Sequence, residues 1–371
     1  MAGGLLAVLA ATASAAVVQP KPTPSWQTNG RVLAIQIVGS VAYIGGKFTS
    51  VRPAGDPAGT GEVARNHVAA INLSTQTLLP WNPNTSGTVQ AIAVSGSTVY
   101  LGGSFAKVGG KVHTDIAAVD ATTGVPIAGF KAKANAAVMT LATNGTSVFA
   151  GGNFTTMNGI AAGYLAAVNP STGALNSGWQ ATANGAVLAS TLIPGGGALV
   201  IGGKFTTVNG TAQNHLASLV PSTGATQKWA NHTPYAVVAL ASDASGVYVA
   251  GAGTGGNFAG FSSAGSLLWQ GGTNGNVQAI TVLDGFVYVG GHYTSYCGPQ
   301  GGQHTCTTPV ARSKLLAVDE ATGALVTTWH PAANSVLGIF ALAAGTKTLA
   351  LGGDFTKLAG VAQQGFGEFV E

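Results

Sequence analysis

The stretch Val99-Tyr-Leu-Gly-Gly-Ser-Phe105 decides the fold, because close variants of it recur along the whole chain. The second glycines of the seven copies stand at positions 46, 103, 152, 203, 251, 291 and 353. The fifth copy, Val247-Tyr-Val-Ala-Gly251, is degenerate. A recurrence of roughly 50 residues indicates a protein built of repeated supersecondary units.

Each unit contains four short apolar runs that Gly-rich turns separate. In the second unit the runs are residues 89–94, 99–105, 116–119 and the segment that ends at Phe130. None of them is long and periodic enough for a helix, and four such strands match one blade of a β-propeller. The predicted fold class is therefore all-β, a seven-bladed β-propeller with four-stranded blades.

The two ends of the chain complement each other. Six units end their outermost strand in a large aromatic residue: Trp81, Phe130, Trp179, Trp229, Trp269 and Trp329. The seventh unit stops at Glu371 after its third strand, whereas Trp26 precedes the first inner strand. We therefore expect the N-terminal strand to complete the last blade and to close the ring, which removes free sheet edges.

The first residues have the pattern of an export signal. Residues 5–12 are apolar, Ala13-Ser-Ala15 fits a signal-peptidase site, and a Pro-rich polar segment follows. We predict a signal peptide over 1–15, a linker over 16–25, and a secreted, extracellular or cell-surface propeller over 26–371. No positively charged n-region is present, so an ordinary apolar tail and a different true start stay open. No other stretch is long enough for a transmembrane anchor.

Composition limits the classes of function. Hydrophobic residues make up 46% of the 371 residues, which excludes disorder, while Lys, Arg, Asp and Glu together make up only 7%. The net charge of +4 is scattered, so we expect no nucleic-acid partner. Many of the 56 glycines fall in strands and turns, where we expect them to serve packing.

Cys297 and Cys306 enclose a polar, Gly-rich segment. In an exported chain such a pair is most simply a disulfide. A metal site with His292 and His304 is the alternative, but an eight-residue gap between the cysteines is not a zinc spacing. We predict the disulfide, no metal and no cofactor.

The repeat resembles a known family. Phe154-Thr-Thr-Met-Asn-Gly159 is followed by Leu165-Ala-Ala-Val168 and Ser171-Thr-Gly173, and the fourth unit repeats the pattern over 205–224. This combination resembles secreted bacterial β-propellers of delta-sixty-type repeats, many of them domains of unknown function. The resemblance covers about 26–371 and implies the fold and an extracellular setting, but no catalytic residues. The fifth unit lacks the Asn-Gly loop, so we expect its surface to differ.

A second resemblance is weaker. Residues 117–124 and 317–329 look like the Ala-x-Asp-x-x-Thr-Gly-x-x-x-Trp motif of quinoprotein propellers. Those proteins typically have eight blades, and the quinone enzymes often add a vicinal disulfide and a carboxylate-lined calcium site. Here the units number seven, the cysteines are nine positions apart and acids are sparse, so quinoprotein activity is a minor alternative.

Long loops gather on one predicted face, where the connections after second and fourth strands meet. The largest are residues 50–65 and 294–314. Long loops on a rigid scaffold usually carry binding, so the candidate binding residues are Arg52, Asp56, Arg65, His67, His113, Asp115, His215 and His292. His232 and His304 map to the same face. These histidines either form a polar or metal-binding funnel or are unrelated loop residues, and we favour the second interpretation.

These features predict a secreted, non-catalytic binding or cell-surface scaffold protein that recognises a glycan or an extracellular protein through its loop-rich face. The enzyme question stays open, with catalysis the less favoured answer, because no Ser-His-Asp order or nucleophile elbow is visible. The alternative is a secreted polysaccharide hydrolase or lyase, or a quinoprotein dehydrogenase. A pair of carboxylates about 5–10 Å apart in the central funnel would favour a glycosidase.

Overall fold

The computed structural model describes residues 16–229, 233–253, 255–299 and 306–371. Within these ranges the chain forms strands and turns and contains no helix, which confirms the all-β class. The predicted signal peptide over 1–15 lies outside the described residues, as do His232 and His304.

Each repeat unit forms one antiparallel sheet, numbered here as units 1 to 7. Unit 1 contains β2 (Val32–Val38), β3 (Val41–Gly46), β6 (Val68–Asn72) and β7 (Thr77–Leu78). Unit 2 contains β8 (Thr88–Ser95), β9 (Thr98–Ser104) and β12 (Ile116–Asp120); unit 3 contains β13 (Val138–Thr143), β14 (Val148–Gly152) and β17 (Leu165–Val168); unit 4 contains β18 (Val187–Leu192), β19 (Leu199–Gly203) and β22 (Leu216–Leu219).

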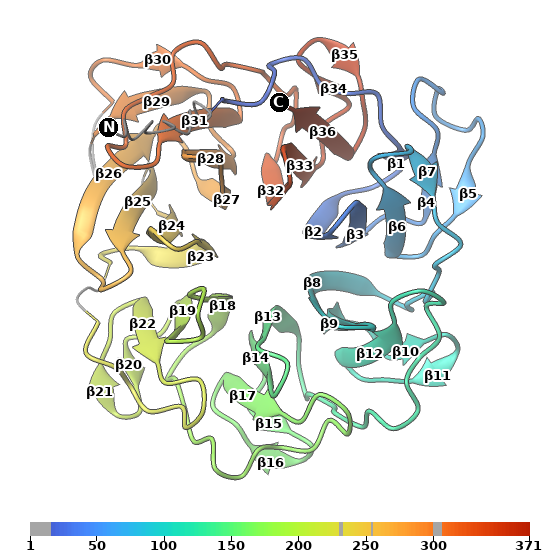
Figure 1. The fold of residues 1–371 in the computed structure, drawn as a ribbon, viewed down its shortest axis with the longest axis vertical. Helices are drawn as coiled ribbons and strands as arrows, with labels where there is room; N and C mark the ends of the chain where they lie inside the picture. Colours follow the sequence, from blue (N-terminus) through green and yellow to red (C-terminus); the bar gives the residue numbers. More distant parts are fainter. Residues whose placement is uncertain (1–15, 230–232, 254, 300–305) are drawn as a thin grey trace, which may run out of the picture.

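The second half of the chain repeats this order. Unit 5 contains β23 (Ala236–Ser242), β24 (Gly246–Ala252), β25 (Gly256–Ser262) and β26 (Leu267–Thr273); unit 6 contains β27 (Val277–Leu283), β28 (Phe286–Gly291) and β31 (Leu315–Asp319); unit 7 contains β32 (Ile339–Gly345), β33 (Thr348–Gly353) and β36 (Phe366–Val370). Figure 1 shows the sheets around a common centre, with the first strand of each unit innermost. Successive innermost strands contact each other, and β32 contacts β2.

The outermost strand is shorter than predicted. Among the described residues, only units 1 and 5 pair a full fourth strand, β7 or β26, with the third. In units 2, 3, 4 and 6 a single bridge replaces it, such as Val119 to Pro126. The reason is local, because an Asp120-capped turn leads into the bridge and a second turn, closed by the Phe130 amide on the Ile127 carbonyl, leads the chain away.

The two adjacent glycines at the end of a second strand are required for two different steric reasons. A Cβ on Gly45 would lie 2.6 Å from Cγ1 of Val89 in unit 2, and one on Gly46 would lie 2.1 Å from the carbonyl oxygen of Arg31 in its own unit. The same two contacts recur in units 2, 3, 4, 6 and 7. The first glycine therefore admits the neighbouring sheet, as predicted, while the second admits the backbone that enters its own inner strand.

Six units carry a small hairpin between the second and third strands. The hairpins are β4 (Ser50–Arg52) with β5 (Val63–Ala64), β10 (Lys107–Val108) with β11 (Lys111–Val112), β15 (Thr156–Met157) with β16 (Ile160–Ala161), β20 (Thr207–Val208) with β21 (Thr211–Ala212), β29 (Ser295–Gly298) with β30 (Val310–Ala311), and β34 (Lys357–Leu358) with β35 (Val361–Ala362). They lie toward the periphery of the ring in Figure 1. Unit 5 joins β24 to β25 directly, so its surface does differ.

The hydrophobic core lies between neighbouring sheets. One cluster joins Tyr43 and Trp81 of unit 1 to Val89 and Leu101 of unit 2. The two aromatic rings meet edge to face at 5.1 Å, and both reach the turn after β12: Tyr43 Oη donates to the Ala121 carbonyl (2.9 Å) and Trp81 Nε1 to the Asp120 carbonyl (3.0 Å). An aromatic pair thus locks one sheet to the next.

The seam between units 7 and 1 joins the two ends of the chain. The amide of Gln19 donates to the Val370 carbonyl (2.7 Å) and that of Thr23 to the Glu368 carbonyl (2.9 Å), so the N-terminal segment runs along β36. β1 (Gln27–Thr28) then pairs with β4 of unit 1. Trp26 Nε1 donates to the Gln76 carbonyl of unit 1 (3.0 Å), in the same way that Trp81 reaches unit 2.

The side chains of this seam are exchanged relative to the others. In unit 1 the aromatic Tyr43 pairs with the small Ala70, whereas in unit 7 the small Ala350 pairs with the large Glu368. The Glu368 carboxylate accepts a hydrogen bond from Nε2 of Gln76 across the seam. Glu368 is 1% exposed and its Oε2 has no hydrogen-bond partner among the described residues, and burial raises its pKa to about 7.

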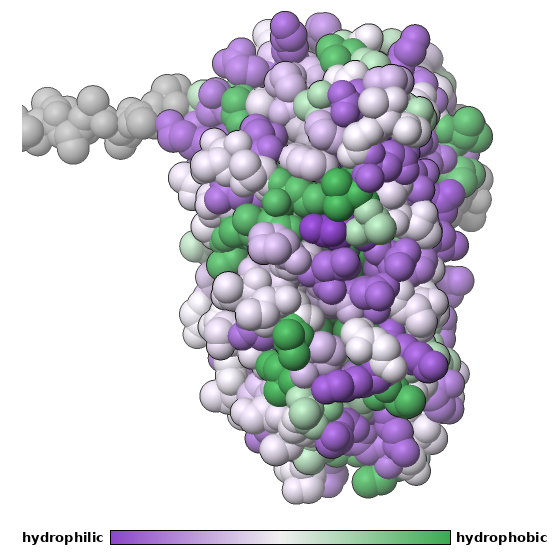
Figure 2. Space-filling view, turned by 90° about the vertical axis from the view of Figure 1, so that its right-hand side faces the viewer, coloured by the Kyte–Doolittle hydropathy of each residue, from purple (hydrophilic) through white to green (hydrophobic). Residues whose placement is uncertain are grey.

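The outer wall is chemically mixed. Figure 2 shows the side of the molecule that carries units 1 and 2, where hydrophobic residues form small patches among hydrophilic ones. Exposed apolar side chains of unit 2 include Val112 and Val125. No helix within the described ranges has the length and apolar character needed to cross a membrane.

Candidate functional site

A cavity lies where the inner strands of all units converge, and we call it the axial cavity. Its volume is about 310 Å³, and its lining consists of Leu33, Gln90, Met139, Leu188, Val238, Ala252, Asn276, Gln278 and Phe340. All but Ala252 and Asn276 are the second or third residue of an inner strand, one from each unit. The cavity is therefore a product of the repeat and not of any single loop.

A β-bulge in every inner strand places these side chains. In unit 2, Val89 pairs with Gly103 and Ala91 pairs with Gly102, so Gln90 between them is left out of the ladder. The same shift occurs in all seven units. A bulge re-aims the unpaired residue, and here the re-aimed residues meet at the axis.

The cavity narrows beyond the bulged residues. A second hollow of about 190 Å³ is lined there by Ala34, Ala91, Ala189, Ala239, Ala279 and Ala341, among others. Thr140 and Ser190, also in this lining, share a hydrogen bond of 2.8 Å. Small residues thus line the inner strands where they are most crowded, and the wider axial cavity lies at the end where these strands begin.

Few polar groups face the axial cavity. The side-chain oxygens of Gln90 and Gln278 are buried without a hydrogen-bond partner among the described residues. Asn276 Oδ1 accepts from the Gly253 amide at 3.4 Å. Arg31 precedes the first inner strand, and its guanidinium carbon lies 4.6 Å from the ring centroid of Phe340. The lining is therefore mainly apolar and carries two glutamines with buried, unpaired side-chain oxygens, while the cation of Arg31 lies beside the lining, against Phe340.

Of the candidate residues of the unit 1 loop, Arg52 lies at the seam between units 7 and 1, whereas Arg65 binds carbonyls of its own unit. Arg52 is 4% exposed and donates to the Asp56 carbonyl (3.0 Å), to Gln27 Oε1 (3.2 Å) and to Gln364 Oε1 of unit 7 (2.7 Å). Arg65 donates to the Ala64 and Leu79 carbonyls at 2.9 and 3.0 Å. Both arginines thus bind backbone or amide groups, and burial lowers the pKa of Arg65.

Three further candidates occupy one repeated backbone position. His67, Asp115 and His215 all have φ between 65° and 67° and accept the amide of the second glycine of their own unit. Tyr164 and Lys314 take the same position in units 3 and 6. These residues are spread over separate units, so the structure does not bring them together.

Their side chains turn inward on their own units. Nδ1 of His67 and of His215 donates to a glycine carbonyl at 3.2 Å. Asp115 Oδ1 accepts the Phe105 amide (3.0 Å), and burial raises the pKa of this carboxyl. Burial also acts on His67, where it lowers the pKa of the imidazole. The geometry supports the interpretation of these histidines as separate loop residues.

The last two histidine candidates also stand apart. His113 follows β11 and is buried, and this burial, with the positive charges of Lys131 and Lys111, lowers its pKa. His292 directly follows β28 and is exposed. No group of three His, Cys, Asp or Glu that could hold a metal ion occurs among the residues that the structure describes.

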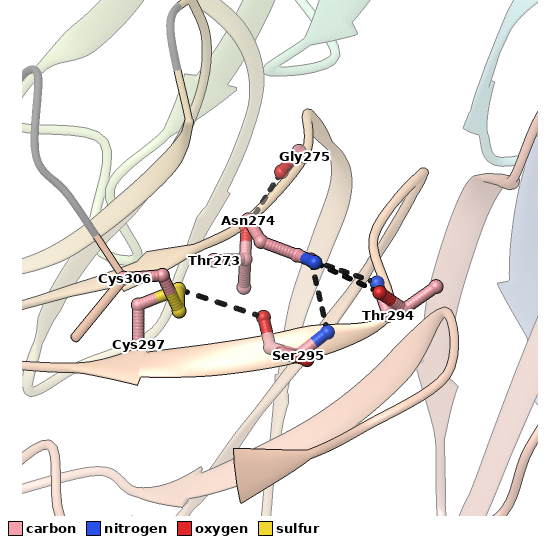
Figure 3. Close-up of a disulfide and its surroundings, with 7 residues drawn as sticks. All are labelled: Thr273, Asn274, Gly275, Thr294, Ser295, Cys297 and Cys306. Carbon is pink, nitrogen blue, oxygen red and sulfur yellow. Dashed lines mark hydrogen bonds between the residues drawn. A yellow bond between two sulfur atoms is a disulfide. The ribbon is translucent and has the colours of Figure 1, made fainter. Parts of the chain in front are cut away.

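Cys297 and Cys306 form a disulfide, with their Cα atoms 4.8 Å apart. Figure 3 shows it beside Asn274, whose Oδ1 accepts the Thr294 and Ser295 amides, both at 2.9 Å. β29, which carries Cys297, also pairs with β26 of unit 5. The disulfide therefore fixes a hairpin that joins units 5 and 6.

The conserved-looking motif residues are structural. Asn135 Oδ1 accepts the Thr155 and Thr156 amides, and its Nδ2 donates to Thr155 Oγ1 (3.0 Å); Asn29, Asn184, Asn274 and Asn334 do the same in other units. Asn158 of the Asn-Gly turn links the Lys133 amide to the Gly173 carbonyl. The Gly-Gly-x-Phe-Thr pattern thus identifies the scaffold and leaves the cavity residues free to vary.

Comparison with known proteins identifies the fold. No family model and no curated protein sequence matches the chain. The WD40 β-propeller domain of Doa1 superposes with a TM-score of 0.58 at 12% identity, over 94% of this chain and 97% of that one. The computationally designed Ika8 protein gives a TM-score of 0.57 at 14% identity, over 94% and 98%. The chain therefore has a β-propeller-like fold.

Proposed function

We propose that the protein is an exported binding protein, a seven-bladed β-propeller whose ligand enters the axial cavity from the loop-rich face. The observation that carries this proposal is the convergence of one side chain from every unit on a single, mainly apolar cavity. Cavities of this size with a few convergent polar groups are the usual form of a ligand site.

The blade count and the closure rest on the repeat. Seven sheets follow one another, the innermost strands contact in order, and the N-terminal segment pairs with β36. We count each sheet as one blade and the N-terminal segment as the missing outer strand of the last. The resemblance to delta-sixty-type propellers supports the same count.

Export rests on the sequence and on the disulfide. Residues 1–15 have the pattern of a signal peptide. Disulfides such as that of Cys297 and Cys306 persist in oxidising compartments outside the cytosol. A location outside the cell, free or at its surface, is consistent with both.

Binding is favoured over catalysis by the chemistry of the lining. The described residues that line the axial cavity are apolar or carry amides, whereas glycoside hydrolysis uses two carboxyl groups that flank the bond. We propose no cofactor. A secreted hydrolase, lyase or quinoprotein is the alternative, and turnover of a bound ligand would establish it.

Of the two ligand classes predicted from sequence, an extracellular protein suits the cavity better than a glycan. A glycan presents many hydroxyl groups, and burying them requires hydrogen-bond partners. The lining offers few, and most of its surface comes from Leu33, Met139, Leu188, Val238 and Phe340.

The proposal is tested by screening residues 16–371 against a glycan array and a displayed peptide library. The Leu188→Trp variant fills the axial cavity, and Val125→Trp on the outer wall of unit 2 is the matched control. We expect ligands that bind the wild type and the control but not Leu188→Trp. Equal binding to all three proteins would place the site elsewhere, and cleavage of a bound ligand would make the protein an enzyme.

A further inference from the structure

The axial cavity offers a specific set of groups to a ligand. Its walls carry the half-exposed side chains of Leu33, Met139 and Leu188, so binding removes apolar surface from water. Any polar group that enters must find a partner, because an unpaired buried polar atom costs free energy. Whether each unpaired polar atom is a donor or an acceptor therefore determines which polar groups the ligand must carry.

Two of the free atoms are hydrogen-bond acceptors. Gln90 of unit 2 and Gln278 of unit 6 both line the cavity, and the side-chain oxygen of each is buried without a partner within the described residues. An amide oxygen accepts and does not donate. A ligand that satisfies it must bring an N–H or O–H group.

The third polar group is a cation that lies beside the cavity, just before β2. Arg31 stacks on Phe340 of the lining, and its Nε is buried without a partner among the described residues. The equivalent residues of the other units, each two positions before the bulged residue, are uncharged: Thr88, Ala137, Ala186, Ala236, Asn276 and Gly338. The charge is therefore placed at one side of the ring, between units 1 and 7.

The carboxylate of Asp354 in unit 7 already has hydrogen-bond partners. Asp354 of unit 7 accepts hydrogen bonds from Ser335 Oγ and from the amides of Leu337 and Gly338, both at 3.2 Å. Its recorded partners are thus backbone and hydroxyl groups of its own unit. A guanidinium with a free N–H binds a carboxylate with a charge-assisted hydrogen bond.

We propose that the axial cavity binds an apolar α-amido carboxylate, a group with a carboxylate, a neighbouring amide N–H and an apolar side chain. Arg31 binds the carboxylate, a glutamine oxygen accepts the amide N–H, and the apolar side chain fills the space between Leu33, Met139 and Leu188. Both an N-acyl amino acid and the C-terminal residue of a polypeptide have this chemistry. The inference rests on the proposed binding function and names its ligand class.

Isothermal titration of residues 16–371 tests the proposal with matched pairs of probes. N-acetyl-L-leucine is compared with N-acetyl-L-leucinamide, and a hexapeptide that ends in leucine as the free acid is compared with its C-terminal amide. We expect each free acid to bind at least about tenfold more tightly than its amide. If only the free-acid hexapeptide binds, the site recognises polypeptides. If N-acetyl-L-leucine binds as well, the α-amido carboxylate that both acids share is the ligand.

Single substitutions test which side chain makes each proposed contact with the ligand. Arg31→Met keeps an apolar chain over Phe340 and removes the charge, so it should weaken the acids about tenfold or more and leave the amides unchanged. Gln90→Leu and Gln278→Leu should weaken acid and amide alike. Lys47→Met, which removes an exposed lysine that does not line the cavity, should change nothing.

Two outcomes would overturn the inference. One is equal affinity for each acid and its amide, and the other is unchanged acid binding by Arg31→Met. If neither acid binds while another ligand from the screen is lost in Leu188→Trp, this ligand class is wrong and the binding function stands. If no ligand depends on the cavity, both proposals fail together.

Discussion

The seam between units 1 and 2 and the seam between units 7 and 1 solve the same packing problem with different side chains. At the first, Tyr43 opposes Ala70 and its hydroxyl reaches the turn of the next unit. At the second, Ala350 opposes Glu368 and the carboxylate reaches Gln76. The large residue has moved to the neighbouring strand, so the space between the sheets is filled by a group that titrates.

The two seams also differ in how the chain supplies them. Trp81 directly follows the strands of its own unit in the sequence. Trp26, which makes the corresponding bond to unit 1, comes from a segment that runs along β36 of unit 7 but precedes it by more than 300 residues. The closing seam therefore depends on non-covalent contacts between residues more than 300 positions apart, such as the bond from Arg52 to Gln364. The comparison predicts that this seam is the more easily opened.

The largest effect is expected from removing the N-terminal segment. A chain that begins at residue 30 loses the pairing with β36, strand β1 and the buried Val18 and Trp26 contacts. We expect a loss of more than about 5 kcal/mol, comparable to the stability of a whole domain. Circular dichroism melting and size-exclusion chromatography measure it, with a chain from residue 16 as control. An unchanged melting temperature would contradict the proposed closure.

Next in size is the loss of an aromatic lock. Trp81→Ala removes a side chain that is fully buried and hydrogen-bonded, and large-to-small changes of this kind cost about 3–5 kcal/mol. Trp26 is partly exposed, so Trp26→Ala should cost roughly half as much. Urea unfolding of the two variants compares the seams directly, and an equal cost would show that they are equivalent.

Glu368→Gln should change the pH dependence of stability. The folded pKa of about 7 lies above the ordinary value of 4.5, so the protonated carboxyl favours the fold. Stability from this group is complete below pH 4.5 and is lost as pH rises through 7, by up to about 3 kcal/mol.

The variant should be more stable than the wild type at pH 8 and equal to it at pH 4. Chemical unfolding at a series of pH values measures the difference. Because Asp115 is unchanged in both proteins, the difference isolates Glu368. A constant difference across this range would refute the assignment of the titration to the closing seam.

A smaller effect is expected from the disulfide in the unit 6 hairpin, which pairs with β26 of unit 5. Replacing Cys297 and Cys306 by serine opens a short loop, and we expect a loss of about 2 kcal/mol. Thermal unfolding measures it, and intact-mass analysis of alkylated protein checks the disulfide itself. Two free thiols in the unreduced wild type would contradict the structure.

The smallest effect is expected from converting the closing seam to the ordinary form. In the double variant Ala350→Tyr and Glu368→Ala the large side chain returns to the second strand, and exchanges that conserve volume usually cost less than about 1.5 kcal/mol. The decline of stability between pH 4.5 and 7 should also disappear. Failure of the double variant to fold would show that the N-terminal segment requires the carboxylate.

The sequence predicts the repeat and the all-β class well because packing requires the Gly-Gly pair in six of the seven units and a large aromatic residue in nearly the same place of each. It does not reveal the bulges. A bulge breaks the alternation of buried and exposed residues on which strand prediction depends, and residues as different as Leu33, Gln90 and Met139 occupy the same position. The cavity lining therefore has no common residue type to detect.

The histidine candidates show how a repeated residue type can be misleading. His67 and His215 are alike in residue type and in backbone position, which suggests a cluster on paper. The position is set by a left-handed backbone conformation and a hydrogen bond to glycine, and Tyr164 or Lys314 fills it as well. Repetition of a residue in a ring protein thus separates its copies in space.

The pairing of the N-terminal segment with β36 has a consequence for the order of events during synthesis. Gln19 and Thr23 are made well before their partners Val370 and Glu368, which follow them by about 350 residues. At about 5–20 residues per second, the segment waits roughly 20 to 70 s for its partner strand. Units 1 to 6 can assemble while the chain emerges, whereas the contacts between the N-terminal segment and unit 7 form only after β36 has been made.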